Sequence, residues 1–187
     1  MAKDTTQVLL GPGTFYVAAV VAGVAEPAPA DPTVAPGVDW EDIGYSTDGW
    51  NLVNDLTYEF FTPAEEVDPI ATLKSAQECH FLGIAAQFSL DNLKIALGGG
   101  TITTDAGPPA TQTYVPPSST GYDRFSVLFR TAAPGTAKIR DIYVPFVISM
   151  SSVDIPHTKG ANPSVVAIDM RALKVTGDDL FTIVETT

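Results

Sequence analysis

The sequence predicts a mainly β protein, an antiparallel β-sandwich or half-barrel with one short flanking α-helix. About ten short segments are rich in β-branched or aromatic residues, several with two-residue alternation, and Gly/Pro-rich turns separate them. A single segment shows the leucine spacing of a helix. The 187 residues are 45% apolar and 17% charged, which favours a single globular domain over residues 1–187.

The first quarter of the chain predicts a strand, a long loop and two short strands. A Gly-Pro-Gly turn signal at residues 11–13 precedes a β-branched and aromatic run at residues 14–21. Residues 23–37 are rich in proline and alanine, so we expect an extended, exposed loop. Short strands are expected at residues 40–45 and 50–53, with the turn residues Ser46, Thr47, Asp48 and Gly49 between them.

The next three strands differ in polarity. In residues 56–61, Leu56, Tyr58 and Phe60 alternate with Thr57 and Glu59, which predicts one apolar and one polar face. An acidic turn at residues 62–69 and a polar strand at residues 70–80 follow. Residues 81–88 predict a half-buried core strand with two sides; Leu82, Ile84, Ala86 and Phe88 form one side, and Gly83, Ala85 and Gln87 the other.

One helix is expected after residue 88. Ser89 is a candidate N-cap, and Leu90, Leu93 and Leu97 follow at spacings of three and four, which predicts an apolar stripe packed on the sheet. Three glycines at residues 98–100 should end the helix, because glycine accepts the left-handed conformation.

The C-terminal half predicts strands alone. Pro145 lies inside one of them, so that strand should be at a sheet edge or carry a bulge. The expected strands cover residues 101–104, 112–115, 122–130, 137–149, 165–175 and 180–184.

Charge and composition exclude several classes of function. Twenty-two acidic and ten basic residues give a net charge of −12, which repels nucleic-acid phosphates, so specific binding to DNA is not expected. The single cysteine, Cys79, cannot form an internal disulfide, and every apolar run is too short for a signal peptide or a membrane span. We therefore expect a soluble protein of the reducing cytoplasm, with no membrane association.

Catalytic and metal-binding patterns are missing from the sequence. His80 and His157 lie far apart, and Cys79 and His80 should point to opposite faces of a strand. No nucleotide-binding loop or serine-nucleophile motif occurs, so we expect neither an enzyme nor a cofactor. The aromatic residues Trp40, Tyr45 and Trp50 leave two alternatives: core or interface packing, or the stacking platform of a carbohydrate-binding module on a virion or cell surface.

The order of the motifs resembles the major tail tube proteins of long-tailed, non-contractile bacteriophages. The resemblance rests on LGPGTFYVAAV, on VDWEDIGYSTDGW, on the acidic turn EEVDP and on the LDNLKIALGGG helix, and it covers roughly the first hundred residues. It implies hexameric rings that stack into a hollow tube through which DNA passes without specific binding. It also implies tape-measure, baseplate or tip and tail terminator proteins as partners, and a place in the virion after assembly in the host cytoplasm.

Two sets of residues would serve such an assembly. The acidic residues expected to line the bore or its rim are Glu59, Glu65, Glu66, Asp68 and Glu78. The loop of residues 23–37 is expected to reach a neighbouring subunit or ring, with Glu26, Pro27, Pro29, Asp31 and Pro32 at the contact.

Overall fold

A computed structural model describes residues 13–65, 67–118, 121–132, 138–153 and 165–186. Within these ranges the protein has ten strands and one helix, and all strand pairs between them are antiparallel, which confirms the predicted mainly β class. The elements are β1 (Gly13–Ala19), β2 (Glu41–Asp42), β3 (Ser46–Phe61), β4 (Ala71–Ala85), α1 (Leu90–Ala96), β5 (Thr101–Asp105), β6 (Thr111–Val115), β7 (Phe125–Ala132), β8 (Ile139–Ser149), β9 (Val166–Ala172) and β10 (Thr182–Glu185).

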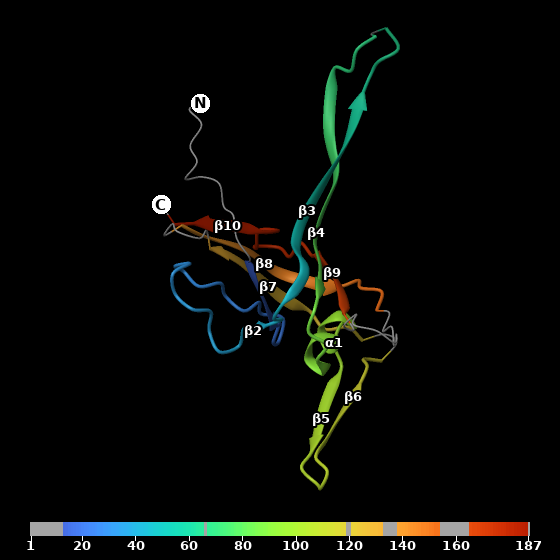
Figure 1. Ribbon diagram of the computed structural model, residues 1–187. Helices are drawn as coiled ribbons and strands as arrows, with labels where there is room; N and C mark the ends of the chain where they lie inside the picture. The colour runs from blue at the N-terminus through green and yellow to red at the C-terminus, as the bar shows by residue number, and fades with distance from the viewer. Residues whose placement is uncertain (1–12, 66, 119–120, 133–137, 154–164, 187) are drawn as a thin grey trace.

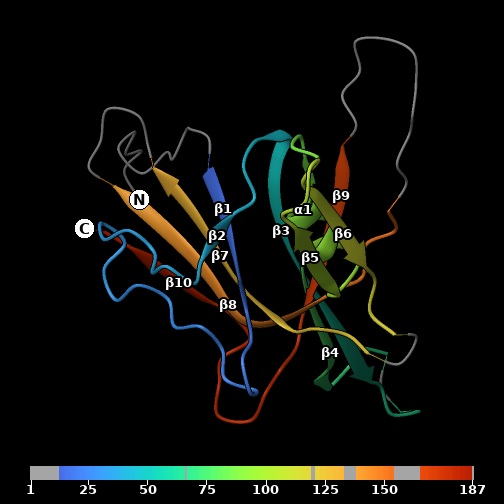
Figure 2. The ribbon, with the colours of Figure 1, turned by 90° about the horizontal axis from the view of Figure 1, so that it is seen from below.

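Eight strands form one sheet that bends in the middle. The order is β2-β1-β7-β8-β9-β4-β3, and β10 pairs with β8 outside this path. The first half of β8 pairs with β10 and its last three residues pair with β9, so β8 belongs to both parts of the sheet. Figure 2 shows β1, β7, β8 and β10 on one side and β3, β4 and β9 on the other, an arrangement consistent with a sandwich.

Pro145 lies at a bulge, one of its two predicted settings. Phe125 pairs with Val147 and Val127 pairs with Val144, so one residue of β7 faces two residues of β8. The carbonyl of Pro145 accepts a hydrogen bond from Ser126 Oγ at 2.9 Å. A central strand therefore tolerates the proline because the ladder is already interrupted there.

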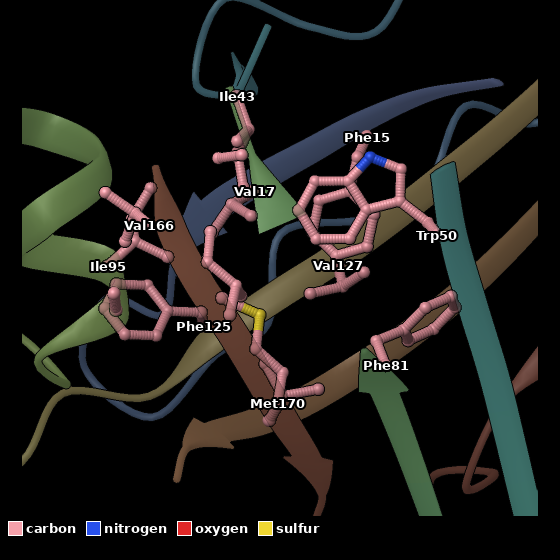
Figure 3. Close-up of a cluster of buried hydrophobic side chains, with 14 of the residues drawn as sticks. Phe15, Val17, Ile43, Trp50, Phe81, Ile95, Phe125, Val127, Val166 and Met170 are labelled. Carbon is pink, nitrogen blue, oxygen red and sulfur yellow. The ribbon is translucent and has the colours of Figure 1, made fainter. Parts of the chain in front are cut away.

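The main core lies between the two parts of the sheet. Phe15 on β1 stacks on Trp50 of β3, with ring centroids 4.0 Å apart, and meets the edge of Phe81 on β4 at 5.5 Å. Figure 3 shows these rings together with Val127 and Met170. Strands from the two ends of the sheet thus share one core.

Three predicted breaks in the strands are wrong, and one of them is the break between the strands expected at residues 50–53 and 56–61, which are both part of β3. The expected turn at residues 46–49 is part of β3, where Gly49 has a φ of +80° and the register shifts between Ser46 and Trp50. The turn-forming residues produce an irregularity instead of a chain reversal, because Ser46 and Trp50 both pair with β4 in one antiparallel ladder. The strands expected at residues 70–80 and 81–88 form the single strand β4, which ends at Ala85.

The core side of β4 is the one that carries Gly83. Phe81 and Ala85 are buried, whereas Leu82 and Ile84 are only partly buried and Phe88 is exposed. A Cβ built on Gly83 would lie 2.2 Å from Trp50 Cε3, so the indole ring occupies the space above this glycine. The larger side chains at residues 82 and 84 point away from the core because Trp50 already covers the opposite face.

Helix α1 has the predicted caps but a different buried face. Ser89 Oγ accepts a hydrogen bond from the Asn92 backbone N–H at 3.0 Å, and Gly98 and Gly99 donate to carbonyls of the last turn. Leu93, Ile95 and Ala96 are buried, whereas Leu97 follows the last helical residue and is 39% exposed. The predicted packing of Leu97 on the sheet is therefore wrong, while Leu93 is buried and Leu90 is partly buried.

Candidate functional site

The outer halves of β3 and β4 form a two-stranded arm that projects from the body (Figure 1). Among the described residues, β9 pairs with β4 only between His80 and Ala85, and residues 54–61 and 71–78 pair solely with each other. These strand residues and the turn of residues 62–70 are called the arm. Every strand residue of the arm is exposed.

One face of the arm is apolar. Directly paired residues share a face, and the register Leu56↔Gln77, Tyr58↔Lys74 and Phe60↔Thr72 defines this apolar face. Leu56, Tyr58 and Phe60 are 42%, 49% and 65% exposed. The same face continues into the body, where Leu52 and Cys79 pack at the core end of the strands.

The opposite face of the arm, called the acidic face, carries the acids of the two strands together with the exposed apolar side chains of Phe61 and Leu73. Asp55 pairs with Glu78 and Glu59 pairs with Leu73, so Glu59 and Glu78 share this acidic face with Asp55. Asp55 was not among the predicted acidic residues. Asp55, Thr57 and Glu59 follow one another at intervals of two, however, which places them on the same face of a strand.

The remaining predicted acids belong to the turn. Glu65 and Asp68 are exposed at the tip of the arm, and Glu66 lies outside the described residues. Within the described part of the chain, Asp55, Glu59, Glu65 and Asp68 have no salt bridge. The structure therefore brings Glu59 and Glu78 onto one face and places Glu65 and Asp68 beyond it.

An ionic cluster joins the base of the arm to β9. Glu78 Oε1 lies 2.5 Å from Arg171 Nη2, His80 Nδ1 lies 3.1 Å from Asp169 Oδ1, and His80 Nε2 lies 3.6 Å from Glu78 Oε2. His80 and Arg171 form the last pair of the β4–β9 ladder on the side of the arm. We call these four residues the basal clasp. Glu78 therefore differs from the other acids of the arm, because a cation balances its charge.

As an isolated chain, the arm is an unfavourable structure. A two-stranded ribbon in water has marginal stability, and here aromatic side chains are exposed along it. In the part of the chain that the structure describes, β3 is also the last strand of its sheet, so its outer edge offers backbone groups to another strand. These properties are typical of a surface that another chain covers.

The loop of residues 23–37 is held against the chain's own sheet. Its Glu26 N–H donates to Ser126 Oγ at 3.0 Å, and its Glu26 carbonyl accepts from the Tyr143 hydroxyl at 2.8 Å. The Pro27 carbonyl accepts from Trp40 Nε1 at 3.3 Å, and Pro32 is buried. The loop thus covers the face of the sheet opposite the main core, around Leu128 and Trp40.

The other predicted contact residues of the loop have local surroundings. Pro29 is half-buried, and the carboxylate of Asp31 accepts bonds from the Thr33 backbone and hydroxyl at 2.8 Å each. These bonds lower the pKa of Asp31 below its ordinary value. Contact of the loop with a neighbouring subunit stays a prediction.

The geometry gives little support to a reactive cysteine, a carbohydrate-stacking platform or a metal site. Cys79 is 1% exposed, and burial raises the pKa of its thiol to about 11, so it stays protonated near neutral pH. Trp40 and Trp50 are 7% and 9% exposed and belong to different clusters, so they cannot form a shared stacking platform. Among the described residues, no three His, Cys, Asp or Glu side chains gather as a metal site.

Comparison with known proteins adds no identity. No protein-family model matches the sequence, and no curated protein matches it. In the part of the chain that the structure describes, no helix has the length and apolar character needed to span a membrane.

Proposed function

We propose that the protein is a structural subunit that assembles with identical copies into stacked hexameric rings, as the major tail tube protein of a long-tailed, non-contractile bacteriophage. The rings enclose a bore through which DNA passes during ejection. The assembled tube is part of the virion and forms in the host cytoplasm. Tape-measure, tip and tail terminator proteins are its partners at the two ends and inside the tube.

The observation that supports assembly is the arm. Its apolar face continues the core side of β3 and β4, but no layer of the same chain covers it beyond Leu52 and Cys79 among the described residues. Burying Leu56, Tyr58 and Phe60 against another copy stabilises the assembly by roughly 1.5–3 kcal/mol for each of these side chains that becomes fully covered. The monomer therefore leaves free energy available for association.

The acidic face supports a bore that does not retain DNA. Asp55 and Glu59 lie on the side of the ribbon opposite the apolar face, so a contact through the apolar face leaves them in solvent. Repulsion between carboxylates and phosphates prevents counterion-release binding, which is the main source of non-specific affinity for DNA. Copies arranged around an axis with this face inward would form an electronegative wall.

The proposal is tested by imaging and sedimentation of the purified chain. We expect six-fold rings or tubes in negative-stain micrographs at high protein concentration, and sedimentation coefficients that rise with concentration. A chain that remains monomeric at every concentration, in low and in high salt, would contradict it.

A shortened variant provides the matched control. Replacing residues 56–77 with Asn-Gly closes Asp55 and Glu78 with a two-residue hairpin turn and leaves the body unchanged. This variant should fold, with Trp50 still buried on Phe15, but should form neither rings nor tubes. If it assembled like the parent chain, the arm would not be the assembly element.

A further inference from the structure

A cavity of about 520 Å³ lies between β1, the start of β2 and helix α1. Core side chains of Val17, Ile95 and Phe125 form its floor. Val21 and Val38 stand at its wall and are 72% and 99% exposed, so the apolar surface of the cavity is open to solvent. Such a cavity accepts side chains that are themselves apolar.

The rim of the same cavity is acidic. Glu26, Asp39, Glu41 and Asp91 line it together with one cation, Lys94. None of these four carboxylates has a salt bridge within the described part of the chain. The rim therefore favours an apolar group that carries a positive charge beside it.

The apolar face of the arm has this combination of properties. Lys74 is the only cationic residue between residues 54 and 78, and it pairs with Tyr58 on the face that also holds Leu56 and Phe60. Its amino group contacts Gln77 on the same face and forms no salt bridge within the described residues. Asp55 and Glu59 lie on the opposite face, so they do not oppose the approach of this face to an acidic rim.

We propose that the apolar face of one copy's arm docks in this cavity of a second copy, with Lys74 against the acidic rim; this contact rests on the proposed function and names its partner surface. The arm projects from one side of the body, while β2 and α1 lie toward the other side (Figure 1). Donor and acceptor surfaces are therefore different parts of the chain. Such a heterologous contact repeats from copy to copy and produces rings or filaments.

Cross-linking between two single-cysteine variants tests the contact directly. Lys74→Cys in one chain and Asp39→Cys in another, mixed and treated with a short bis-maleimide, should give a covalent dimer that contains both chains. Leu73→Cys is the matched control, because Leu73 neighbours Lys74 in β4 but lies on the acidic face. Native Cys79 is buried and does not compete for the reagent.

Charge exchange gives a second measurement. Lys74→Glu should raise the protein concentration needed for assembly by about fivefold at low salt, the effect of one partly exposed ion pair. Asp39→Lys should do the same, and combining the two substitutions in one chain should restore much of the loss. High salt should reduce the difference between the variants and the parent chain.

The outcomes separate this contact from the proposed function. Rings that form without a Lys74–Asp39 cross-link, and without sensitivity to either charge reversal, would overturn the docking and leave the tube proposal standing. A specific cross-link in small oligomers that never become rings would support the docking and contradict the tube. A cross-link of equal yield from Leu73→Cys would overturn the docking, since it would show no preference for the apolar face.

Discussion

The buried ion pair Arg130–Asp141 is the charged contact with the most consequence at the scale of single residues. Arg130 Nε and Nη2 donate to the two carboxylate oxygens of Asp141 at 2.7 and 2.6 Å, and Asp141 is 3% exposed. Arg130 Nη1 also donates to the Val34 carbonyl at 2.7 Å, so this side chain ties the loop of residues 23–37 to the sheet. The bonds with Asp141 raise the pKa of Arg130 above its ordinary value.

Removing the cation should destabilise the fold strongly. We expect Arg130→Met to lower the free energy of unfolding by about 3–5 kcal/mol, because it leaves a buried carboxylate without a partner. Urea unfolding followed by tryptophan fluorescence measures the change. Arg140→Met is the control, since its partner Glu185 is exposed and its loss should matter far less. Equal losses in the two variants would show that the burial of Asp141 is unimportant.

Cys79 makes the fold sensitive to alkaline pH. Burial raises the pKa of its thiol from 9.0 to about 11, so between these values the unfolded chain loses a proton that the folded chain keeps. The stabilisation of the folded state by the protonated Cys79 thiol is complete below pH 9 and is lost as the pH rises toward 11. Tyr143 has a pKa raised from 10.0 to about 12, also by burial, and acts in the same direction at higher pH.

The corresponding measurement is the free energy of unfolding at pH 8, 9, 10 and 11. For the parent chain we expect the free energy of unfolding to decline above pH 9. For Cys79→Ala we expect this free energy to fall less steeply with pH between pH 9 and 10. A loss of packing in the variant changes the value at pH 8 but not the slope. Identical slopes would contradict an effect of the thiol.

At the scale of elements, the basal clasp lies where it can restrain the arm relative to the body. The clasp lies where β9 leaves β4 and the three-stranded sheet becomes a two-stranded ribbon. Arg171 is the last residue of β9 that pairs with β4. Its side chain reaches Glu78, which lies in the arm, where no third strand is paired with β4. This ion pair therefore acts across the position where the ribbon can bend.

Breaking the clasp should loosen the arm without unfolding the body. We expect Arg171→Met to increase amide hydrogen exchange in residues 71–78 severalfold, while β7 and β8 keep the exchange rates of the parent chain. Lys138→Met is the control, because Lys138 lies just before β8 and contacts Glu185 of β10, outside the arm. Unchanged exchange in the arm would show that the backbone ladder alone sets its direction.

At the scale of the whole molecule, Leu56, Tyr58 and Phe60 lie on one face of the ribbon and Asp55 and Glu59 on the other, although exposed Phe61 and Leu73 share the acidic face. This separation matters for the proposed tube, since one face would join copies and the other would meet DNA. Glu78 contributes less to the field than the sequence suggested, because Arg171 balances it. The unpaired acids of the arm are Asp55, Glu59, Glu65 and Asp68 among the described residues.

Reversing these charges should affect DNA passage more than assembly. Particles that carry Asp55→Lys and Glu59→Lys should form tubes of normal appearance but release DNA more slowly at low salt, with the delay reduced in high salt. Release can be followed by the fluorescence of a DNA-binding dye. Lys138→Glu is a charge-changing control outside the arm. Release at the parent rate would argue against an acidic bore formed by these residues.

Local features of the fold were predictable because they depend on neighbouring residues. Ser89 and the glycines after Leu97 identify both ends of α1, and the alternation from Leu56 to Phe60 identifies the apolar face of the arm. The continuous strand β3 was not predictable from residues 46–49, because turn formers in a bulge and in a hairpin have the same composition. Leu97 was placed wrongly because the seven-residue helix ends before it.

The sequence by itself determined the β class, the helix caps, the acidic charge and the alternation of polar and apolar residues along the arm. Only the tertiary structure decided that β9 ends at the base of the arm, that Trp50 covers Gly83 and selects the core side of β4, and that the loop of residues 23–37 covers its own sheet. The physical reason is that alternation defines two faces of a strand, while the elements that pack against it determine which face is buried.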